Sequence, residues 1–365
     1  MAPEWDAMKL VLTVLARDEA DVIDAQIAFH LNAGVDFVIA TDNASRDGTT
    51  AILEAYARKG CLYLIHEPAE GLRQGEWVTR MARLAASEFG ADWVINSDAD
   101  EFWWPRGGSL KEVLAAVPDR YGVVQGFWRS FVPRPDDGAF FAERMTARLT
   151  VHAPINDPSS FYRPVPKVAH RADPRVVVGR GNHDLVGSLL VPLRSWHPIE
   201  VLHFPLRSRA QWKRKVELQG EAFTKHIERA GTGYHLTGYS ALQSVRIEEQ
   251  HESLVVDDDR LARGLADGTL IEDFRLRDIL RWLRLQDAAD LQRSFAVPSE
   301  LRERASFPAP SVAEDAAYAV EAAVLGEADS IRVQRRLDAL EQRLNSLERR
   351  RRRAALRVGV RNRSS

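Results

Sequence analysis

Residues 93–102 join a short apolar run to three acids, Asp98, Asp100 and Glu101, and this junction constrains the fold more than any other segment. The run has the length of a buried strand, and burying carboxylates directly after it is unfavourable unless a cation offsets their charge. In an extended segment residues two apart point the same way, so we expect Asp98 and Asp100 to converge and Glu101 to point elsewhere. Oxygen ligands suit Mg or Mn, which keep positions open for phosphate oxygens. The alternative is an acidic surface turn.

Apolar runs and helical patterns alternate through the first hundred residues. The apolar runs predict strands at residues 9–16, 37–41, 62–65 and 93–96, and further along the chain at 122–127 and 199–204. Strands that alternate with helices indicate βαβ units, and the nearly continuous run 9–16 indicates a strand covered on both faces. The sequence therefore predicts an α/β fold with a mostly parallel sheet.

Polar residues gather where three of these strands end. Residues 17–19 follow the first strand, residues 42–45 the second and residues 98–101 the fourth. Ligands of open parallel sheets bind outside the carboxyl ends of the strands, so we expect these clusters to converge on a ligand. Asp18 and Asp47 have a second explanation, because an aspartate before a helix commonly caps it.

The rest of the chain divides into segments of different character. After a main domain at residues 1–215, helical patterns predict an extension at 216–297 and a linker or helical segment at 298–329. Within 330–348, apolar residues recur at alternating spacings of four and three, the a/d pattern of a coiled coil. These residues are Val333, Leu337, Leu340, Leu344 and Leu347. The alternative is one amphipathic helix packed on its own body.

The net charge of −2 hides an asymmetry between the tail and the body. Residues 349–365 contain eight arginines and no acid, which leaves 42 basic and 52 acidic residues elsewhere, a charge of −10. A nucleic-acid-binding surface carries the opposite sign, so we expect no nucleic-acid partner. The Arg-rich tail predicts a basic arm that continues the helix and meets an anionic membrane surface or another polyanion. Solvated disorder is the alternative.

Three features of the composition bound the cellular setting. No apolar stretch approaches the roughly 18 residues of a membrane span. Residues 1–7 contain Glu4 and Asp6 in place of the basic start of a signal peptide. The single cysteine, Cys61, excludes a disulfide within the chain. We therefore expect a cytoplasmic protein, peripheral on the inner face of the membrane if the tail binds lipid.

Three motifs in this order resemble the family 2 glycosyltransferases of GT-A fold, particularly bacterial members with an Arg-Asn-Glu start and an Asp-Ala-Asp-Glu-Phe motif. They are residues 17–19, 42–49 and 98–102, and the resemblance covers about residues 8–215. It implies a GT-A, Rossmann-like domain at 1–215. It also implies a nucleotide-diphosphate sugar as donor, with Mn or Mg as the metal.

The resemblance also implies roles for single residues. Those implied to contact the nucleotide are Arg17, Glu19, Asp42, Asn43, Arg73 and Asp98. Those implied to hold the metal are Asp98, Asp100 and His203. Asp18 stands where Asn is usual and Asn43 where many relatives carry Asp, which leaves the nucleobase open.

Glycosyl transfer needs a cation to offset charge on the leaving diphosphate and a base to remove the proton of the acceptor hydroxyl. Candidate bases are His183 and Asp184, with Asp173 as a third and a simple polar turn as the alternative. By family analogy the anomeric configuration inverts, and a glycan or lipid-linked acceptor is expected in polysaccharide biosynthesis. The predicted function is thus a metal-dependent inverting hexosyl- or related transferase. The heptads are compatible with a homo-oligomer.

Two other functions remain open. A nucleotidyltransferase also binds nucleotides at strand ends through carboxylates, although residues 17–20 are not the Gly-rich basic loop that such enzymes carry. A noncatalytic scaffold would use the coiled coil and the tail beside a degenerate nucleotide-sugar domain. A P-loop enzyme is excluded, because the sequence has no Gly-x-x-x-x-Gly-Lys-Ser/Thr motif.

Overall fold

The computed structural model describes residues 8–68, 73–154, 165–225, 247–284, 307 and 310–361. Within these residues a nine-stranded sheet has the order β3-β2-β1-β4-β8-β6-β10-β5, with β9 beside β6, and β7 and β11 form a second sheet. The strands are β1 Leu10–Ala16, β2 Phe37–Asp42, β3 Leu62–His66, β4 Trp93–Asp98, β5 Glu101–Pro105, β6 Val123–Ser130, β7 Ala147–Leu149, β8 Pro166–Arg171, β9 Pro192–Leu193, β10 Ile199–His203 and β11 Leu270–Glu272.

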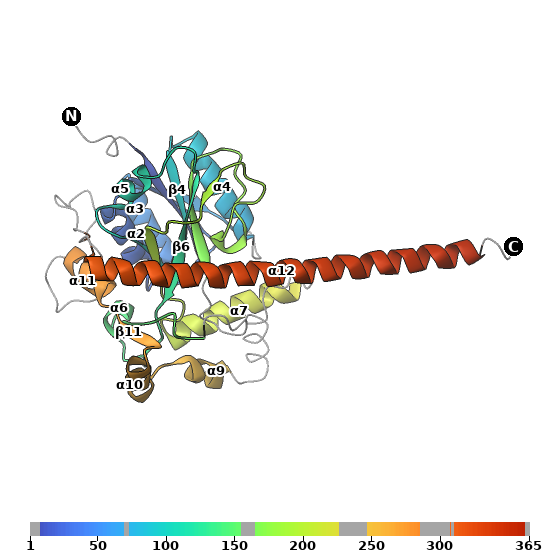
Figure 1. Cartoon of the computed structure of the whole chain (residues 1–365). Helices are drawn as coiled ribbons and strands as arrows, with labels where there is room; N and C mark the ends of the chain where they lie inside the picture. Colours follow the sequence, from blue (N-terminus) through green and yellow to red (C-terminus); the bar gives the residue numbers. More distant parts are fainter. Residues whose placement is uncertain are drawn as a thin grey trace.

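The first four strands are parallel, as the alternating pattern predicts. Helices α2 (Ile23–Asn32) and α3 (Thr49–Arg58) pack on one face of this part of the sheet, and α4 (Gln74–Ser87) packs on the other (Figure 1). Within β1, Leu10 and Leu12 join the core under α2, while Val11 joins the core under α4. Strand β1 is apolar throughout because both of its faces are covered.

The second half of the sheet mixes directions. Strand β8 lies between β4 and β6 and is antiparallel to both, and β5 is antiparallel to β10. Strands β9 and β10 run parallel to β6. The prediction of an α/β fold with a mostly parallel sheet is confirmed, and the antiparallel strands fall in the part that carries no βαβ pattern.

The remaining helices lie around this sheet and along the chain that follows it. They are α5 Leu110–Ala115, α6 Phe141–Arg144, the 3-10 helix η1 Arg180–Asn182, α7 Arg209–Lys225, α9 Ile247–Leu254, α10 Asp258–Asp267, α11 Arg275–Leu283 and α12 Val312–Arg361. The predicted helical extension at 216–297 is helical in α9, α10 and α11, with the short strand β11 between the last two. Its parts at 226–246 and 285–297 lie outside the described residues.

Helix α12 is one continuous helix of 50 residues, and it includes part of the predicted linker or helical segment at 298–329 as well as the predicted coiled-coil helix at 330–348. It begins at a reciprocal cap: Ser311 N donates to Glu314 Oε2 at 2.7 Å, and Glu314 N donates to Ser311 Oγ at 3.3 Å. A Ser followed three residues later by Glu is the sequence signature of a helix start, and it stands at residues 311–314. The helix therefore starts 18 residues earlier than the heptads alone indicate.

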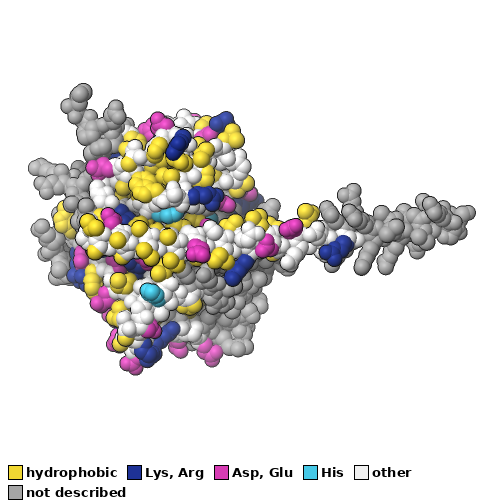
Figure 2. Space-filling model, in the orientation of Figure 1, with side chains coloured by type: hydrophobic (Ala, Val, Ile, Leu, Met, Phe, Trp, Pro, Cys, Tyr) yellow, Lys and Arg dark blue, Asp and Glu magenta, His cyan; other side chains and the backbone are white. Residues whose placement is uncertain are grey.

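The first part of α12 crosses the body, and the rest projects beyond it (Figure 1). Ala322, Leu325 and Ala328 are buried against the body. Where α12 crosses the body, hydrophobic side chains are also visible on its outer surface (Figure 2). Val320 of this helix is exposed. Among the described helices, none combines the length and apolar sequence that a bilayer span requires.

Candidate active site

The carboxyl ends of β1, β2 and β4 meet at one edge of the sheet. The register pairs Ala16 with Asp42 and Leu15 with Asp98, so the loops that follow these three strands leave the sheet side by side. This is the edge at which open α/β sheets bind ligands. The register therefore brings the three polar clusters together, as predicted.

The loops after β1 and β2 are tied to each other by hydrogen bonds. Arg46 N donates to Asp18 Oδ1 at 2.6 Å, and Asp18 N donates to Ser45 Oγ at 3.0 Å. Asp18 has a positive φ of 55° and makes no cap for α2, so the capping explanation of Asp18 is wrong. Asp47 accepts from Thr49 N at the start of α3, as a residue near a helix start is expected to do.

Asp42 and Asn43 are buried where the loop after β2 begins, and both make hydrogen bonds there. Asp42 is 3% exposed and accepts hydrogen bonds from Thr50 Oγ1 at 2.6 Å and from Ser45 N at 3.2 Å. Asn43 Oδ1 accepts from Arg17 Nη1 at 3.1 Å. The structure thus brings three predicted nucleotide contacts together, with Arg17 the least buried of them.

The acidic motif is a turn, so the extended geometry expected for it is wrong. Strand β4 ends at Asp98 and β5 begins at Glu101, and Ala99 and Asp100 form the turn between them. Because the chain reverses here, Glu101 returns toward the end of β4, and its Oε2 accepts from Asp98 N at 3.0 Å. The prediction that Glu101 points away from Asp98 and Asp100 is therefore wrong for Asp98.

A buried lysine joins Asp98 to Glu101. Lys167 Nζ lies 2.6 Å from Asp98 Oδ2 and 2.8 Å from Glu101 Oε1. Trp128 Nε1 donates to the same Glu101 oxygen at 2.6 Å. Burial opposes the charge on Lys167, but the two carboxylates outweigh it and hold the pKa of Lys167 above its ordinary value. The ammonium group therefore remains charged beside both acids.

Asp100 faces a different set of cations. Lys215 Nζ lies 2.9 Å and Arg207 Nη1 3.7 Å from Asp100 Oδ2, while His203 Nε2 lies 3.8 Å from Oδ1. Burial would raise the pKa of Asp100, but the charges of Lys215 and Arg207 hold it well below its ordinary value. Asp98 and Asp100 thus belong to two ion-pair groups, one on each side of the turn.

Arg207 is a buried hub for the acids that follow β1. Its Nη2 donates to Glu19 Oε2, and its Nε and Nη2 donate to the two carboxylate oxygens of Asp21 at 2.7 and 3.0 Å. Burial raises the pKa of Glu19 to about 7, although Arg207 and Lys215 act in the opposite direction. Glu19, a predicted nucleotide contact, is therefore placed next to Asp100 through a shared guanidinium.

His203 is neutral and fixed by stacking. Its ring lies 4.0 Å from that of Trp128 at an interplanar angle of 13°, and burial lowers its pKa to about 3. His203 Nδ1 has no hydrogen-bond partner in the described part of the chain. A neutral imidazole is the form that ligates a metal.

The predicted metal ligands fit an ion only in part. Asp100 Oδ1 and His203 Nε2 face each other, while the cations approach the other oxygen of Asp100. Mg is commonly held by one or two protein groups together with substrate phosphates, and this pair fits that arrangement. Asp98 does not join it, because Lys167, Gln74 and Asn182 take its oxygens. Among the described residues, no three His, Cys, Asp or Glu side chains form a metal cluster.

The loop after β8 lies against Asp98. Asn182 Nδ2 donates to Asp98 Oδ1 at 3.1 Å, and Lys167 Nζ donates to the carbonyl of Gly181 at 2.7 Å. His183 Nδ1 lies 2.9 Å from the carbonyl of Pro166, so Nδ1 carries the proton and donates. The loop therefore brings one of the two predicted catalytic residues, His183, to the site.

The other candidate bases lie outside this cluster. Asp184 is exposed. Asp173 pairs with Arg175 at 2.8 Å and follows Ala172, whose N–H donates to Asp92 at the beginning of β4. Asp173 thus lies at the opposite end of β4 from Asp98, which removes it as a base for chemistry at this edge.

Helix α4 starts at the site, but Arg73 does not point into the cluster. The Arg73 side chain is 61% exposed and lies 3.9 Å from Glu76. Its neighbour Gln74 reaches the cluster instead, and Gln74 Nε2 donates to Asp98 Oδ1 at 3.0 Å. Gln74 is therefore the residue of this segment that contacts the acids.

Sequence reasoning missed the cations of the site. Arg207 and Lys215 follow β10, so the strand-end argument applied to β10 would have found Arg207. Lys167 lies inside β8 with no motif around it, and Trp128 lies inside β6. These residues come together only when β8 inserts between β4 and β6.

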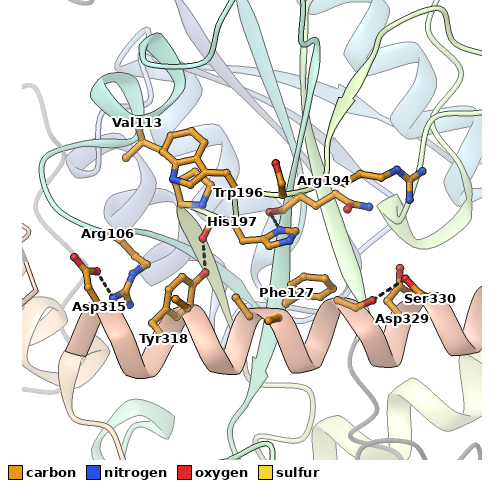
Figure 3. Close-up of a pocket in the computed structure, with 17 residues that line it drawn as sticks. Arg106, Val113, Phe127, Arg194, Trp196, His197, Asp315, Tyr318, Asp329 and Ser330 are labelled. Carbon is orange, nitrogen blue, oxygen red and sulfur yellow. Dashed lines mark hydrogen bonds and ion pairs between the residues drawn. The ribbon is translucent and has the colours of Figure 1, made fainter. Parts of the chain in front are cut away.

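A cavity of about 720 Å³ lies elsewhere, between α12 and the chain before β10 (Figure 3). Phe127, Trp196 and Tyr318 contribute rings to its wall, and none of the acids or cations of the β4 edge lines it. Phe127 and Trp128 point to opposite faces of β6 because they are consecutive strand residues. The cavity and the carboxylate cluster are therefore separate features.

No known family profile and no curated protein sequence match this chain. Similar solved structures include glucosyl-3-phosphoglycerate synthase from Mycobacterium tuberculosis with Mn2+, UDP and glucosyl-3-phosphoglycerate, at 18% identity and a TM-score of 0.26. That match covers 34% of this chain and 47% of that chain, so this chain spans about half the length of that protein.

Structures of TarS from S. aureus, residues 1–349, are also similar to this chain. The complex with UDP-GlcNAc has 11% identity and a TM-score of 0.33, covering 62% of this chain and 69% of that chain. The complex with UDP has 14% identity and a TM-score of 0.33, covering 75% and 90%. Because these identities and TM-scores are low, the similarities carry no argument about what this chain binds.

Proposed function

We propose that this chain is a glycosyltransferase of GT-A type that takes its sugar from a nucleotide diphosphate donor. The observation that carries the proposal is the cluster at the carboxyl edge of β1, β2 and β4, where acids and cations lie side by side. Lys167, Arg207 and Lys215 supply the positive charge that a diphosphate requires. The carboxylates supply oxygens that accept hydrogen bonds from hydroxyl groups and that bind a cation. The GT-A motifs of the sequence support the same conclusion.

The residues divide into roles by their place in the cluster. Arg17, Glu19, Asp42, Asn43 and Asp98 are the proposed nucleotide contacts within the cluster, and Arg73, exposed at the start of α4, is a proposed contact from outside it. Asp100 and His203 are the proposed ligands of Mn or Mg, with Asp98 able to join them only if Lys167 moves away. Such an ion offsets charge on the leaving diphosphate when it is bound. Lys215 and Arg207 already place positive charge beside the other oxygen of Asp100, Oδ2.

His183 is the proposed base for the acceptor hydroxyl. Because its Nδ1 donates to Pro166, the Nε2 atom is the unprotonated one in the neutral ring. Asp184, the second proposed base, is exposed. Inversion, transfer of a hexose or related sugar, and a glycan or lipid-linked acceptor remain parts of this proposal.

Thermal shift with UDP, GDP, TDP and CMP, each with and without Mn, tests the donor site. We expect one diphosphate to raise the melting temperature, and Asp100→Asn to abolish the rise. Asp119→Asn is the matched control, because Asp119 also pairs with an arginine but is fully exposed at another surface. A rise that Asp100→Asn leaves intact would place the nucleotide elsewhere.

Turnover separates the transferase from the other two functions. Hydrolysis or transfer of a nucleotide sugar supports the transferase, whereas pyrophosphate release from a nucleoside triphosphate and a sugar phosphate would indicate a nucleotidyltransferase. Nucleotide binding with no turnover of either kind would indicate the scaffold.

A further inference from the structure

The projecting part of α12 carries an apolar stripe that the body does not cover. Val333, Leu337, Leu340, Leu344 and Leu347 are 41–58% exposed. Their spacings of four and three place them on one side of the helix at positions d, a, d, a and d of a heptad. The alternative that this segment packs on its own body is wrong, because the buried residues of α12 lie earlier, at Ala322, Leu325 and Ala328.

The charged residues on one side of this stripe are acidic, and those on the other side are basic. In the sequence, position e holds Gln334, Glu341 and Glu348, and position g holds Arg336, Arg343 and Arg350. In a parallel pair, position g of one helix faces position e of the next heptad in its partner, which matches Arg with Glu. In an antiparallel pair, g faces g and e faces e, which opposes Arg to Arg and Glu to Glu.

We propose that α12 pairs with a second copy of this chain as a parallel, in-register two-stranded coiled coil through the stripe from Val333 to Leu347. A second copy is the partner that the pattern fits, because a single chain carries both halves of the g–e complementarity. The pairing is independent of the proposed glycosyltransferase function.

The stripe from Val333 to Leu347 is short, which limits the affinity between the two helices. Its fifteen residues span about 21 Å of helix, and arginine at 351 stands at the next a position, where it ends the apolar seam. Two heptads give a weak association. The mass measured by sedimentation equilibrium should therefore rise with concentration from one chain toward two.

Cysteine cross-linking of the full chain tests the direction of the pair. In a Cys61→Ser background, Val333→Cys and Leu347→Cys should each form a disulfide-linked dimer on their own, because equal positions face each other in a parallel pair. Gln342→Cys, exposed at position f, is the control and should not cross-link. In an antiparallel pair centred on Leu340, only a mixture of the first two variants would cross-link.

The outcomes separate clearly. Cross-linking of both single variants above the Gln342→Cys control supports the parallel pair. Cross-linking only in the mixture, equal cross-linking of the control, or a monomer at all concentrations would each overturn it. Glu341→Lys should also weaken the association at least fivefold, while Asp338→Lys, at position b away from the seam, should leave it unchanged.

Discussion

His30 connects α2 to β5 through both nitrogens of its ring. Its Nδ1 donates to the carbonyl of Gln26 at 2.7 Å, and its Nε2 accepts from Trp103 N at 3.1 Å. Burial lowers the pKa of His30 to about 4, because the protonated ring would lose its acceptor and carry an unpaired charge in the core. The neutral ring is thus part of the packing between α2 and β5.

Acid should weaken the fold through this residue. Between pH 6.5 and 4 the unfolded chain binds a proton at His30 that the folded chain does not, so the free energy of unfolding falls as the pH falls. The two pKa values correspond to about 3 kcal/mol. Urea unfolding at pH 7 and pH 4.5 should show a smaller loss for His30→Gln, which keeps a donor and an acceptor. Equal losses in both proteins would contradict this role.

Lys215 allows a second test at the residue scale, one that depends on the proposed function. Lys215→Met removes the ammonium group 2.9 Å from Asp100, so affinity for the nucleoside diphosphate should fall about tenfold or more. Lys213→Met, an exposed neighbour on the same helix, is the control and should bind normally. Calorimetric titration measures both affinities. Normal binding by Lys215→Met would remove Lys215 from the donor site.

At the scale of elements, Tyr318 fixes α12 to the body. Its hydroxyl donates to the carbonyl of His197, and its ring lies 3.7 Å from the guanidinium carbon of Arg106 and 5.2 Å from that of Arg129 (Figure 3 shows the first two contacts around the cavity). The guanidinium groups on an aromatic face and the buried hydroxyl bond each favour the docked helix.

Tyr318→Ala should loosen this docking. We expect a loss of about 3 kcal/mol in the free energy of unfolding and faster amide exchange in the first turns of α12. Val320→Ala, two residues on and 64% exposed, should change neither quantity by more than about 0.5 kcal/mol. Unchanged exchange in Tyr318→Ala would show that other contacts carry the docking.

The elements that the sequence predicted are those with a local pattern. Strands β1 to β4 and the heptad stripe are visible because burial repeats along the chain at a fixed period. The turn at Ala99 and Asp100 was predicted only as the alternative, and on the surface, because an Asp-x-Asp pair has the same spacing in a strand and in a turn; Asp100 is buried. Lys167 has no local signal, since its place beside Asp98 depends on β8 pairing with β4 some 70 residues away in sequence.

At the scale of the whole molecule, charge of opposite sign lies at opposite ends. Residues 1–348 carry a net charge of −10, and seven of the eight arginines of residues 349–365 lie within α12, which ends at Arg361. The second part of this helix projects beyond the body (Figure 1). Asp329 is the last residue of α12 that is buried among the described side chains, and Arg349 follows it by 20 residues. At about 1.5 Å per residue the basic segment therefore begins about 30 Å beyond the body, which is more than the screening length. We therefore expect the tail, and not the body, to contact an anionic surface.

Vesicle binding tests this arrangement. The full chain should bind vesicles that contain phosphatidylserine and not vesicles of phosphatidylcholine, and the binding should weaken from 50 to 500 mM salt because screening shortens. Replacing the five arginines of residues 349–353 with glutamine keeps the length of the chain and should lower the partition at least about 100-fold, at roughly 1 kcal/mol for each charge near the surface. Equal binding by this variant would show that the body, and not the tail, contacts the lipid. Absence of binding by the full chain at every salt concentration would contradict a membrane surface as the partner of the tail.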